Sequence, residues 1–144
     1  MTSHQKSAVV LDTMVVSAIL NATRKPEPAA EYLRLIARRR IVLSFATITE
    51  LRYGALKANW SELRRRSLER SVAHFSIVQA DDALMSTCAR LRASCETDGH
   101  PLGQKLHEAD RWIAATAIHL NLELVSDDRV FTSVNGLTVR SRSH

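Results

Sequence analysis

The sequence predicts an α/β fold: a three-layer α/β/α sandwich around a central, mostly parallel sheet of four or five strands. Short apolar runs such as residues 8–11 lack the alternation of polar and apolar residues that a half-exposed strand shows. Segments with helical periodicity separate these runs, and parallel strands need such crossover connections. The 144 residues suffice for one core, so we expect a single domain over residues 1–144.

The first half of the chain predicts two strands and four helices. After the strand at residues 8–11, apolar residues recur at helical spacing over residues 15–22. Two prolines, Pro26 and Pro28, interrupt the chain, and a helix is expected to resume at residue 29. We expect that helix to cover residues 29–39. The next apolar run predicts a strand at 41–45, and two amphipathic patterns predict helices at 47–58 and 61–74.

The second half predicts the rest of the sheet. A short β-branched run indicates a strand at residues 75–78, and a long helix over 81–97 ends near Gly99. After a loop, a helix over residues 110–120 leads into a fourth strand at 122–125. A further apolar run at residues 137–139 would add a fifth strand.

The chain is basic. Twenty Lys and Arg side chains against 15 Asp and Glu give a net charge of +5 at pH 7, and the pI is about 9.8. Arginine runs at residues 38–40 and 64–66 add local positive charge, although such runs are usually solvated helix faces. A compact basic domain favours an anionic partner, either nucleic acid or an acidic protein segment.

Cysteine content and hydropathy predict a cytoplasmic protein with no membrane segment. Cys88 and Cys95 lie too far apart along one expected helix to form a disulfide, and neither belongs to a CxxC motif typical of zinc or redox sites. The most apolar stretch, residues 8–20, contains Asp12 and is too short to span a bilayer. The first seven residues show no leader pattern.

Acidic residues stand where an open parallel sheet places its binding site, beyond the carboxyl ends of the strands. Asp12 directly follows the first strand, and Asp127 and Asp128 follow the fourth. Glu50 lies on the helix after the second strand, and Asp110 opens the helix before the fourth. We therefore expect these side chains to meet at one edge of the sheet.

Each acid also has a plainer structural interpretation. Asp12 could cap the helix that follows it, and Glu50 fits a capping box that begins at Thr47. Asp110 could cap its own helix, but it shares the apolar face, where a charge needs a partner that the local sequence does not offer. Adjacent aspartates after a strand are commonly turn residues.

Taken together, the acids predict a metal site. Carboxylates gathered at one edge repel one another unless shared protons or a divalent cation neutralise them. Oxygen ligands without clustered His or Cys favour Mg²⁺ or Mn²⁺ over zinc. An acidic metal site in a basic protein indicates phosphodiester chemistry, because the basic surface can hold a polyanion while the acids hold the metal.

Four short segments carry a resemblance to a known family. They are Val-Val-Leu-Asp-Thr ending at Thr13, Thr-Glu-Leu-Arg-Tyr-Gly ending at Gly54, Asp-Arg-Trp-Ile-Ala-Ala-Thr-Ala from Asp110, and Leu-Val-Ser-Asp-Asp-Arg-Val-Phe ending at Phe131. Their order and spacing resemble PIN-domain ribonucleases, in particular the VapC toxins of type II toxin–antitoxin modules. The resemblance covers about residues 8–140 and implies a PIN-like fold. Met14 departs from it, since the family often has Asn or another small polar residue there.

The resemblance implies Mg²⁺-dependent endonucleolytic cleavage of RNA of the tRNA or rRNA class, with Mn²⁺ able to substitute. It places the catalytic acids at Asp12, Glu50, Asp110 and Asp128, with Asp127 as the alternative fourth acid if the loop alignment shifts by one. Asp12, Asp110 and Asp128 would hold the metal, and Glu50 would orient or deprotonate the attacking water. The resemblance also implies a cognate VapB-type antitoxin that neutralises the toxin, and a homodimer.

The sequence also supports a role for Arg111 and two alternative functions. Arg111, beside Asp110, is a candidate contact for RNA or for an antitoxin carboxylate. A non-catalytic PIN-fold domain that binds RNA or protein is one alternative function, although a binder gains nothing from mutually repelling acids. An aspartyl-phosphate protein with Asp12 as nucleophile is another, disfavoured because Asp12-Thr-Met14 lacks the second acid of the phosphatase pattern.

Overall fold

The computed structural model describes residues 8–142 and contains one five-stranded sheet. The strands lie in the order β3-β2-β1-β4-β5, and every neighbouring pair is parallel. Their bounds are β1 Ala8–Leu11, β2 Arg40–Ser44, β3 Ser76–Val78, β4 Leu124–Val125 and β5 Val139–Arg140. The predicted parallel sheet is confirmed, with its fifth strand. The first seven residues, where we expect no leader, lie outside the described part of the chain.

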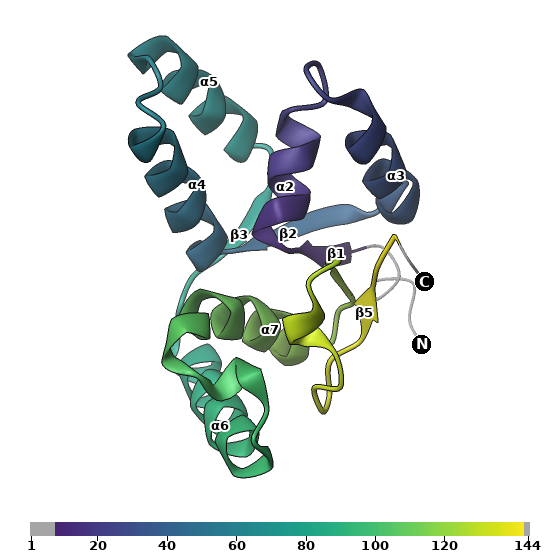
Figure 1. The fold of residues 1–144 in the computed structure, drawn as a ribbon, viewed down its shortest axis with the longest axis vertical. Coiled ribbons are helices and arrows are strands. Elements are labelled where there is room, and N and C mark those ends of the chain that lie inside the picture. Colours follow the sequence, from purple (N-terminus) through teal and green to yellow (C-terminus); the bar gives the residue numbers. More distant parts are fainter. Residues whose placement is uncertain (1–7, 143–144) are drawn as a thin grey trace.

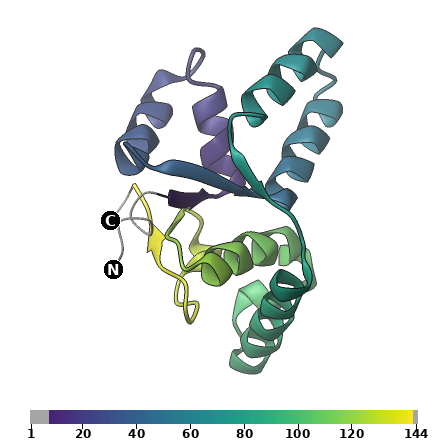
Figure 2. The ribbon, with the colours of Figure 1, turned by 180° about the vertical axis from the view of Figure 1, so that it is seen from behind.

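Helices cover both faces of the sheet. On one face lie α2 (Thr13–Leu20), α3 (Pro26–Ile36), α4 (Phe45–Lys57) and α5 (Glu62–Val72) (Figure 1). On the other face lie α6 (Asp82–Asp98) and α7 (Glu108–Leu120), and Figure 2 shows the same three layers from behind. Three short 3₁₀ turns complete the fold: η1 Pro101–Gly103, η2 Lys105–His107 and η3 Arg129–Phe131.

The central strand β1 explains why its sequence shows no alternation. Val9 and Leu11 pack into the core beneath α2, α3 and α4, whereas Ala8 and Val10 pack into the core beneath α6 and α7. All four residues are buried because both faces of the sheet are covered. An uninterrupted apolar run is therefore what this position in the sheet requires.

Four helices begin two or three residues before the predicted positions: α2 begins at Thr13 and α7 at Glu108, each two residues early, and the starts of α3 and α4 have a clear cause. α3 begins at Pro26 instead of residue 29, because a proline is favourable in the first helical turn, where its missing N–H costs no hydrogen bond. α4 begins at Phe45 instead of Thr47, with Ser44 as N-cap and its Oγ accepting from the Ala46 N–H at 3.1 Å. The capping box proposed for Glu50 is therefore wrong, since Glu50 lies in the second turn.

The segment before α7 is held tightly against α6. A Cβ atom on Gly103 would lie 2.9 Å from the backbone nitrogen of Glu96, so only glycine allows η1 to approach α6 this closely. This contact fixes the entry into α7. Over residues 8–142, no helix combines the length and the apolar character needed to cross a membrane.

Candidate active site

The candidate site begins at the carboxyl end of β1. The register pairs Leu11 with Val125, so the residues that follow these strands, Asp12 and Ser126, lie side by side. Asp12 is 5% exposed and is the N-cap of α2. Its Oδ1 accepts from the Thr13 N–H at 2.8 Å and its Oδ2 from the Ser126 hydroxyl at 2.8 Å. The helix-cap interpretation of Asp12 is thus confirmed, and the same carboxylate faces the sheet edge.

The environment of Asp12 disfavours its negative charge. Burial raises its pKa from 3.8 to about 6, although the hydrogen bonds from Ser126 and Thr13 act in the opposite direction. The charges of Asp110 and Asp128 raise it further, which places both carboxylates within electrostatic reach of Asp12. Three of the acids that the sequence singled out therefore lie near enough for their charges to act on one another.

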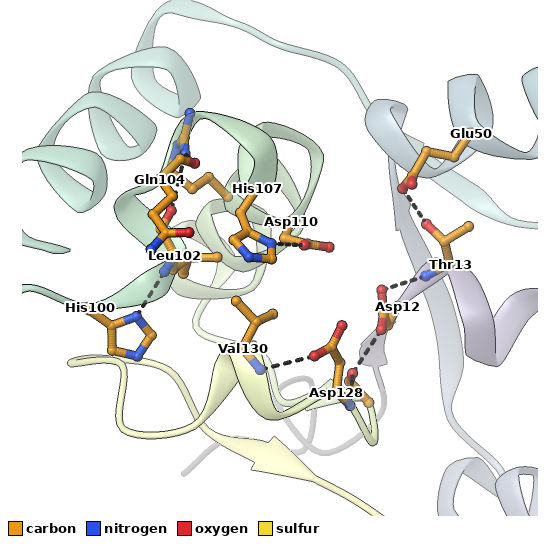
Figure 3. A network of polar contacts seen from close by, with 12 residues as sticks. Asp12, Thr13, Glu50, His100, Leu102, Gln104, His107, Asp110, Asp128 and Val130 are labelled. Carbon is orange, nitrogen blue, oxygen red and sulfur yellow. Dashed lines mark hydrogen bonds and ion pairs between the residues drawn. The ribbon is translucent and has the colours of Figure 1, made fainter. Parts of the chain in front are cut away.

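Asp110 reaches this edge from the first turn of α7. Its Oδ2 lies 2.9 Å from Nδ1 of His107, three residues earlier, and its side chain is 24% exposed (Figure 3). The expectation that no local group would pair with Asp110 is wrong, because η2 turns the His107 ring back onto the carboxylate. Asp110 does not cap the helix, whose N-cap residue is His107.

The two adjacent aspartates after β4 have separate roles. Asp128 Oδ1 accepts from the Val130 N–H at 3.0 Å, and the Asp128 N–H donates to Ser126 Oγ at 3.0 Å, next to Asp12. Asp127 points elsewhere and contacts Tyr32 and Arg142. The geometry therefore favours Asp128 over Asp127 as the fourth acid of the site.

Glu50 joins the site from the opposite side, on the exposed face of α4. The Thr13 hydroxyl donates to Glu50 Oε1 at 2.8 Å and lies 3.2 Å from the hydroxyl of buried Thr47. Because the Thr13 N–H also donates to Asp12, one residue connects these two acids. Figure 3 shows the carboxylates of Asp12, Glu50, Asp110 and Asp128 around the same open space. Glu50 lies on α4 and Asp110 on α7, whereas Asp12 and Asp128 lie in the segments that follow β1 and β4.

The carboxylates of the site do not form a compact cluster. Within residues 8–142, no three Asp, Glu, His or Cys side chains lie close enough together to form a ready-made metal site. Each of the carboxylates of Asp12, Asp110 and Asp128 has a hydrogen-bond partner within the protein. A carboxylate oxygen that accepts one hydrogen bond still has a second lone pair, so the acids keep capacity for a cation.

Sequence reasoning missed three residues that orient these acids: Thr13, His107 and Ser126. Each donates to, or lies within hydrogen-bond distance of, a site carboxylate. Thr13 and Ser126 were detectable in principle, because each follows a strand end at which an acid also stands. Thr13 donates its backbone N–H to Asp12, and Ser126 donates its hydroxyl. For His107 the signal is its position three residues before Asp110, one helical turn away.

Met14, the residue that departs from the family pattern, is 73% exposed. The hydrogen bonds to Asp12 come from Thr13 and Ser126. The departure at position 14 therefore leaves the support of the carboxylate intact.

Arg111 is a structural residue here. It is 3% exposed, and its guanidinium donates to the backbone carbonyls of Leu102, at 3.1 Å, and Gln104. The side chain thereby holds the η1–η2 segment onto the start of α7. Because the guanidinium is buried and engaged, the structure does not support the prediction that Arg111 contacts RNA or an antitoxin.

Replacing Arg111 with Met tests this role. The change keeps an unbranched apolar stem but leaves two carbonyls without their donor, so we expect the free energy of unfolding to fall by about 1–2 kcal/mol. Urea unfolding measures this, with exposed Arg70→Met as the matched control, for which we expect little change. Weaker RNA binding with unchanged stability would instead support the contact role.

Three comparisons relate this chain to known proteins. It is 29% identical over 136 residues to Ribonuclease VapC5 of Mycobacterium tuberculosis, covering 93% of each chain. The fold is similar to DNA-bound VapBC from Salmonella typhimurium, with a TM-score of 0.75, 26% identity and coverage of 94% of this chain and 98% of the other. It is also similar to VapBC-5 from M. tuberculosis, a member of the VapBC family of toxin–antitoxin systems, with a TM-score of 0.64, 29% identity and coverage of 94% and 97%.

A family model for the PIN domain matches residues 9–137, a span that contains every acid of the candidate site. The parallel sheet, the strand-end position of Asp12 and the placement of Asp110 at the start of α7 agree with the resemblance found in the sequence. The chain therefore belongs to the PIN-domain family.

Proposed function

We propose that this protein is a Mg²⁺-dependent endoribonuclease toxin of the VapC type that cleaves RNA of the tRNA or rRNA class. The observation that carries the proposal is that the carboxylates of Asp12, Asp110 and Asp128 face one open space (Figure 3), in a chain of net charge +5. The similarity to Ribonuclease VapC5 supports the activity. A basic surface would supply affinity for RNA that depends on salt but not on sequence.

The donor set fits a divalent cation. Asp12, Asp110 and Asp128 would hold Mg²⁺, and Mn²⁺ could replace it, because both ions prefer carboxylate oxygens. The raised pKa of Asp12, about 6, reflects first its burial and then excess negative charge around it, which a cation would offset. When bound, Mg²⁺ would polarise the scissile phosphate and make a water molecule easier to deprotonate.

The side chains of the protein position the other reactants. Glu50 is exposed at the edge of the site, where it can orient or deprotonate a water molecule, and the Thr13 hydroxyl fixes one of its oxygens. Attack of that water on phosphorus, opposite the leaving 3′ oxygen, yields a 5′-phosphate and a 3′-hydroxyl. Ser126 keeps Asp12 in place by donating to Oδ2. His107 holds Asp110 in the same way.

The partners follow from the same relatives. The similarity to VapBC complexes supports a VapB-type antitoxin that neutralises this chain. We further propose a homodimer that acts in the cytoplasm. A polyanionic substrate and an acidic antitoxin segment would both be attracted by the positive net charge.

Incubating the purified, antitoxin-free protein with total tRNA and rRNA tests the proposed function. The reactions contain Mg²⁺, Mn²⁺ or EDTA, with Asp12→Ala as the test variant and exposed Asp98→Ala as a control that removes a carboxylate far from the site. We expect discrete cuts that require both the metal and Asp12. Folded protein that cuts nothing with either metal would contradict the proposal.

A further inference from the structure

The aspartate that the site does not use lies at the centre of a separate contact network. Asp127 Oδ2 accepts from the Tyr32 hydroxyl at 2.7 Å and from Arg142 Nε at 2.6 Å, and Oδ1 accepts from the Arg142 backbone N–H at 2.8 Å. The Arg142 guanidinium stacks over the Tyr32 ring, 4.5 Å from its centroid, and pairs with Glu31 at 3.9 Å. We call Tyr32, Asp127 and Arg142 the C-terminal clamp.

The clamp joins three segments that are distant along the chain. Tyr32 comes from α3, Asp127 from the loop after β4, and Arg142 from the residues that follow β5. Tyr32 is 5% exposed and the Arg142 side chain 32%, so the contacts are partly shielded from water. Hydrogen bonds to a charged group in such a setting are stronger than those between neutral groups.

The ionisation of Asp127 agrees with these contacts. Partial burial opposes its charge, but the hydrogen bonds from the Arg142 backbone, the Tyr32 hydroxyl and the Arg142 guanidinium outweigh burial and lower its pKa to about 2. The donors of Arg142 and Tyr32 thus hold the Asp127 carboxylate in place. The carboxylate cannot turn toward the acids of the site without losing these donors.

Asp127 lies in the chain between Ser126 and Asp128, two residues whose positions shape the site. Ser126, on one side, donates to Asp12 and accepts from the Asp128 N–H, and Asp128, on the other side, faces the open space. β4 and β5 are only two residues long, so few strand hydrogen bonds hold this loop in place. The contacts of the clamp add to the hydrogen bond from the Ser126 N–H to the Arg140 carbonyl, 3.0 Å, and to the one from the Val130 N–H to Asp128 Oδ1 in restraining this loop.

We infer that Arg142, acting through Asp127 and with Tyr32, is a positioning residue that sets the place of the Asp128 carboxylate for metal binding. The inference rests on the proposed function, because it concerns the metal that Asp12, Asp110 and Asp128 would hold. Mg²⁺ and Mn²⁺ sites depend on ligand geometry, and groups that orient the ligands commonly affect metal affinity by tenfold or more.

Mn²⁺ binding to the full-length, RNA-free protein tests the inference, since the paramagnetic resonance signal of free Mn²⁺ reports the bound fraction without any activity measurement. For Arg142→Ala we expect roughly tenfold weaker Mn²⁺ binding. Arg140→Ala is the matched control: it removes an arginine two residues earlier whose closest acidic partner, Glu123, is 4.0 Å away, and we expect less than about a twofold change.

Two further variants separate the contacts of the clamp. Tyr32→Phe removes one hydroxyl and keeps the ring, so a smaller loss of affinity is expected than for Arg142→Ala. Arg142→Lys keeps the charge but not the planar group that contacts Asp127 and stacks on Tyr32, so it should restore affinity only in part.

In cleavage, Arg142→Ala should raise the Mg²⁺ concentration needed for half-maximal rate while leaving the rate at saturating Mg²⁺ nearly unchanged.

The outcomes distinguish the positioning role of Arg142 from the nuclease activity on which it rests. A lower Tm for Arg142→Ala with Mn²⁺ affinity equal to that of the wild type would overturn the positioning role and leave the nuclease proposal standing. A wild-type protein that neither binds Mn²⁺ nor cuts RNA in Mg²⁺ would overturn both. Weakened binding in Arg142→Ala, with Arg140→Ala unchanged, supports the positioning role.

Discussion

Replacing Asp110 with Asn is expected to reduce RNA cleavage by roughly 10³-fold, since losing a metal-holding carboxylate removes several kcal/mol of transition-state stabilisation. Asn has nearly the same shape and retains an oxygen that can accept a hydrogen bond from His107, now 2.9 Å from the carboxylate. The fold should therefore survive. Single-turnover cleavage of a defined RNA, together with Tm and RNA affinity, measures the separate effects.

Glu108→Gln is the matched control for Asp110→Asn. It neutralises an exposed acid in the same first turn of α7, two residues away, and should leave cleavage within about twofold. Comparing these two variants also distinguishes an enzyme from a non-catalytic binding protein. A binder would keep its function in Asp110→Asn, and full cleavage by that variant would show that Asp110 is not part of the machinery.

Replacing Asp12 with Asn is expected to stabilise the metal-free protein at neutral pH. The pKa of Asp12 is about 6 when folded and 3.8 as a free group, so between these values the folded chain holds a proton that the unfolded chain has released. The stabilisation is complete below pH 3.8 and is lost as the pH rises through 6. Asn imitates the protonated form and should add about 2–3 kcal/mol at pH 7.5, or roughly 6–10 °C in Tm.

Thermal unfolding in EDTA at pH 4.5 and pH 7.5 measures this effect. The advantage of Asp12→Asn should be small at the lower pH and large at the higher one. Added Mg²⁺ should raise the Tm of the wild type but not of the variant, since only the wild type retains the site. An Asp12→Asn protein less stable than wild type at pH 7.5 would show that the carboxylate charge is already compensated.

Asp127→Asn, in the neighbouring loop, is a control for which we expect the opposite change in stability. Its pKa of about 2 lies below the free value of 3.8, because hydrogen bonds from Arg142 and Tyr32 outweigh the effect of burial. Its stabilising contribution is therefore present above pH 3.8 and is lost as the pH falls toward 2. At pH 7.5, neutralising Asp127 should destabilise the protein by about 1–2 kcal/mol, whereas neutralising Asp12 stabilises it.

Local sequence was sufficient for most of the fold. A strand covered on both faces must be apolar throughout, and a helix between two such strands must be amphipathic, so Ala8–Leu11 and its neighbours were recognisable without the structure. Helix starts were less accurate at α3 and α4. Pro26 is the first residue of α3 and Ser44 is the N-cap of α4, and a proline or a serine at such a position is equally compatible with a loop.

For the candidate site, too, the sequence predicts one part and the tertiary structure decides the other. By itself, the sequence determined that Asp12 and the Asp127–Asp128 pair stand at strand ends and Asp110 at a helix start, because parallel strands bring their carboxyl ends to one edge. Only the tertiary structure decided which way each side chain turns. Asp127 is drawn away by Tyr32 and Arg142, Arg111 is buried beneath η1 and η2, and His107 faces Asp110. For Asp127 the deciding partners are Tyr32, 95 residues earlier, and Arg142, 15 residues later, which meet it only when the chain folds. For His107 and Arg111 the partners are near in sequence, but the turns of η1 and η2 decide which way these side chains point.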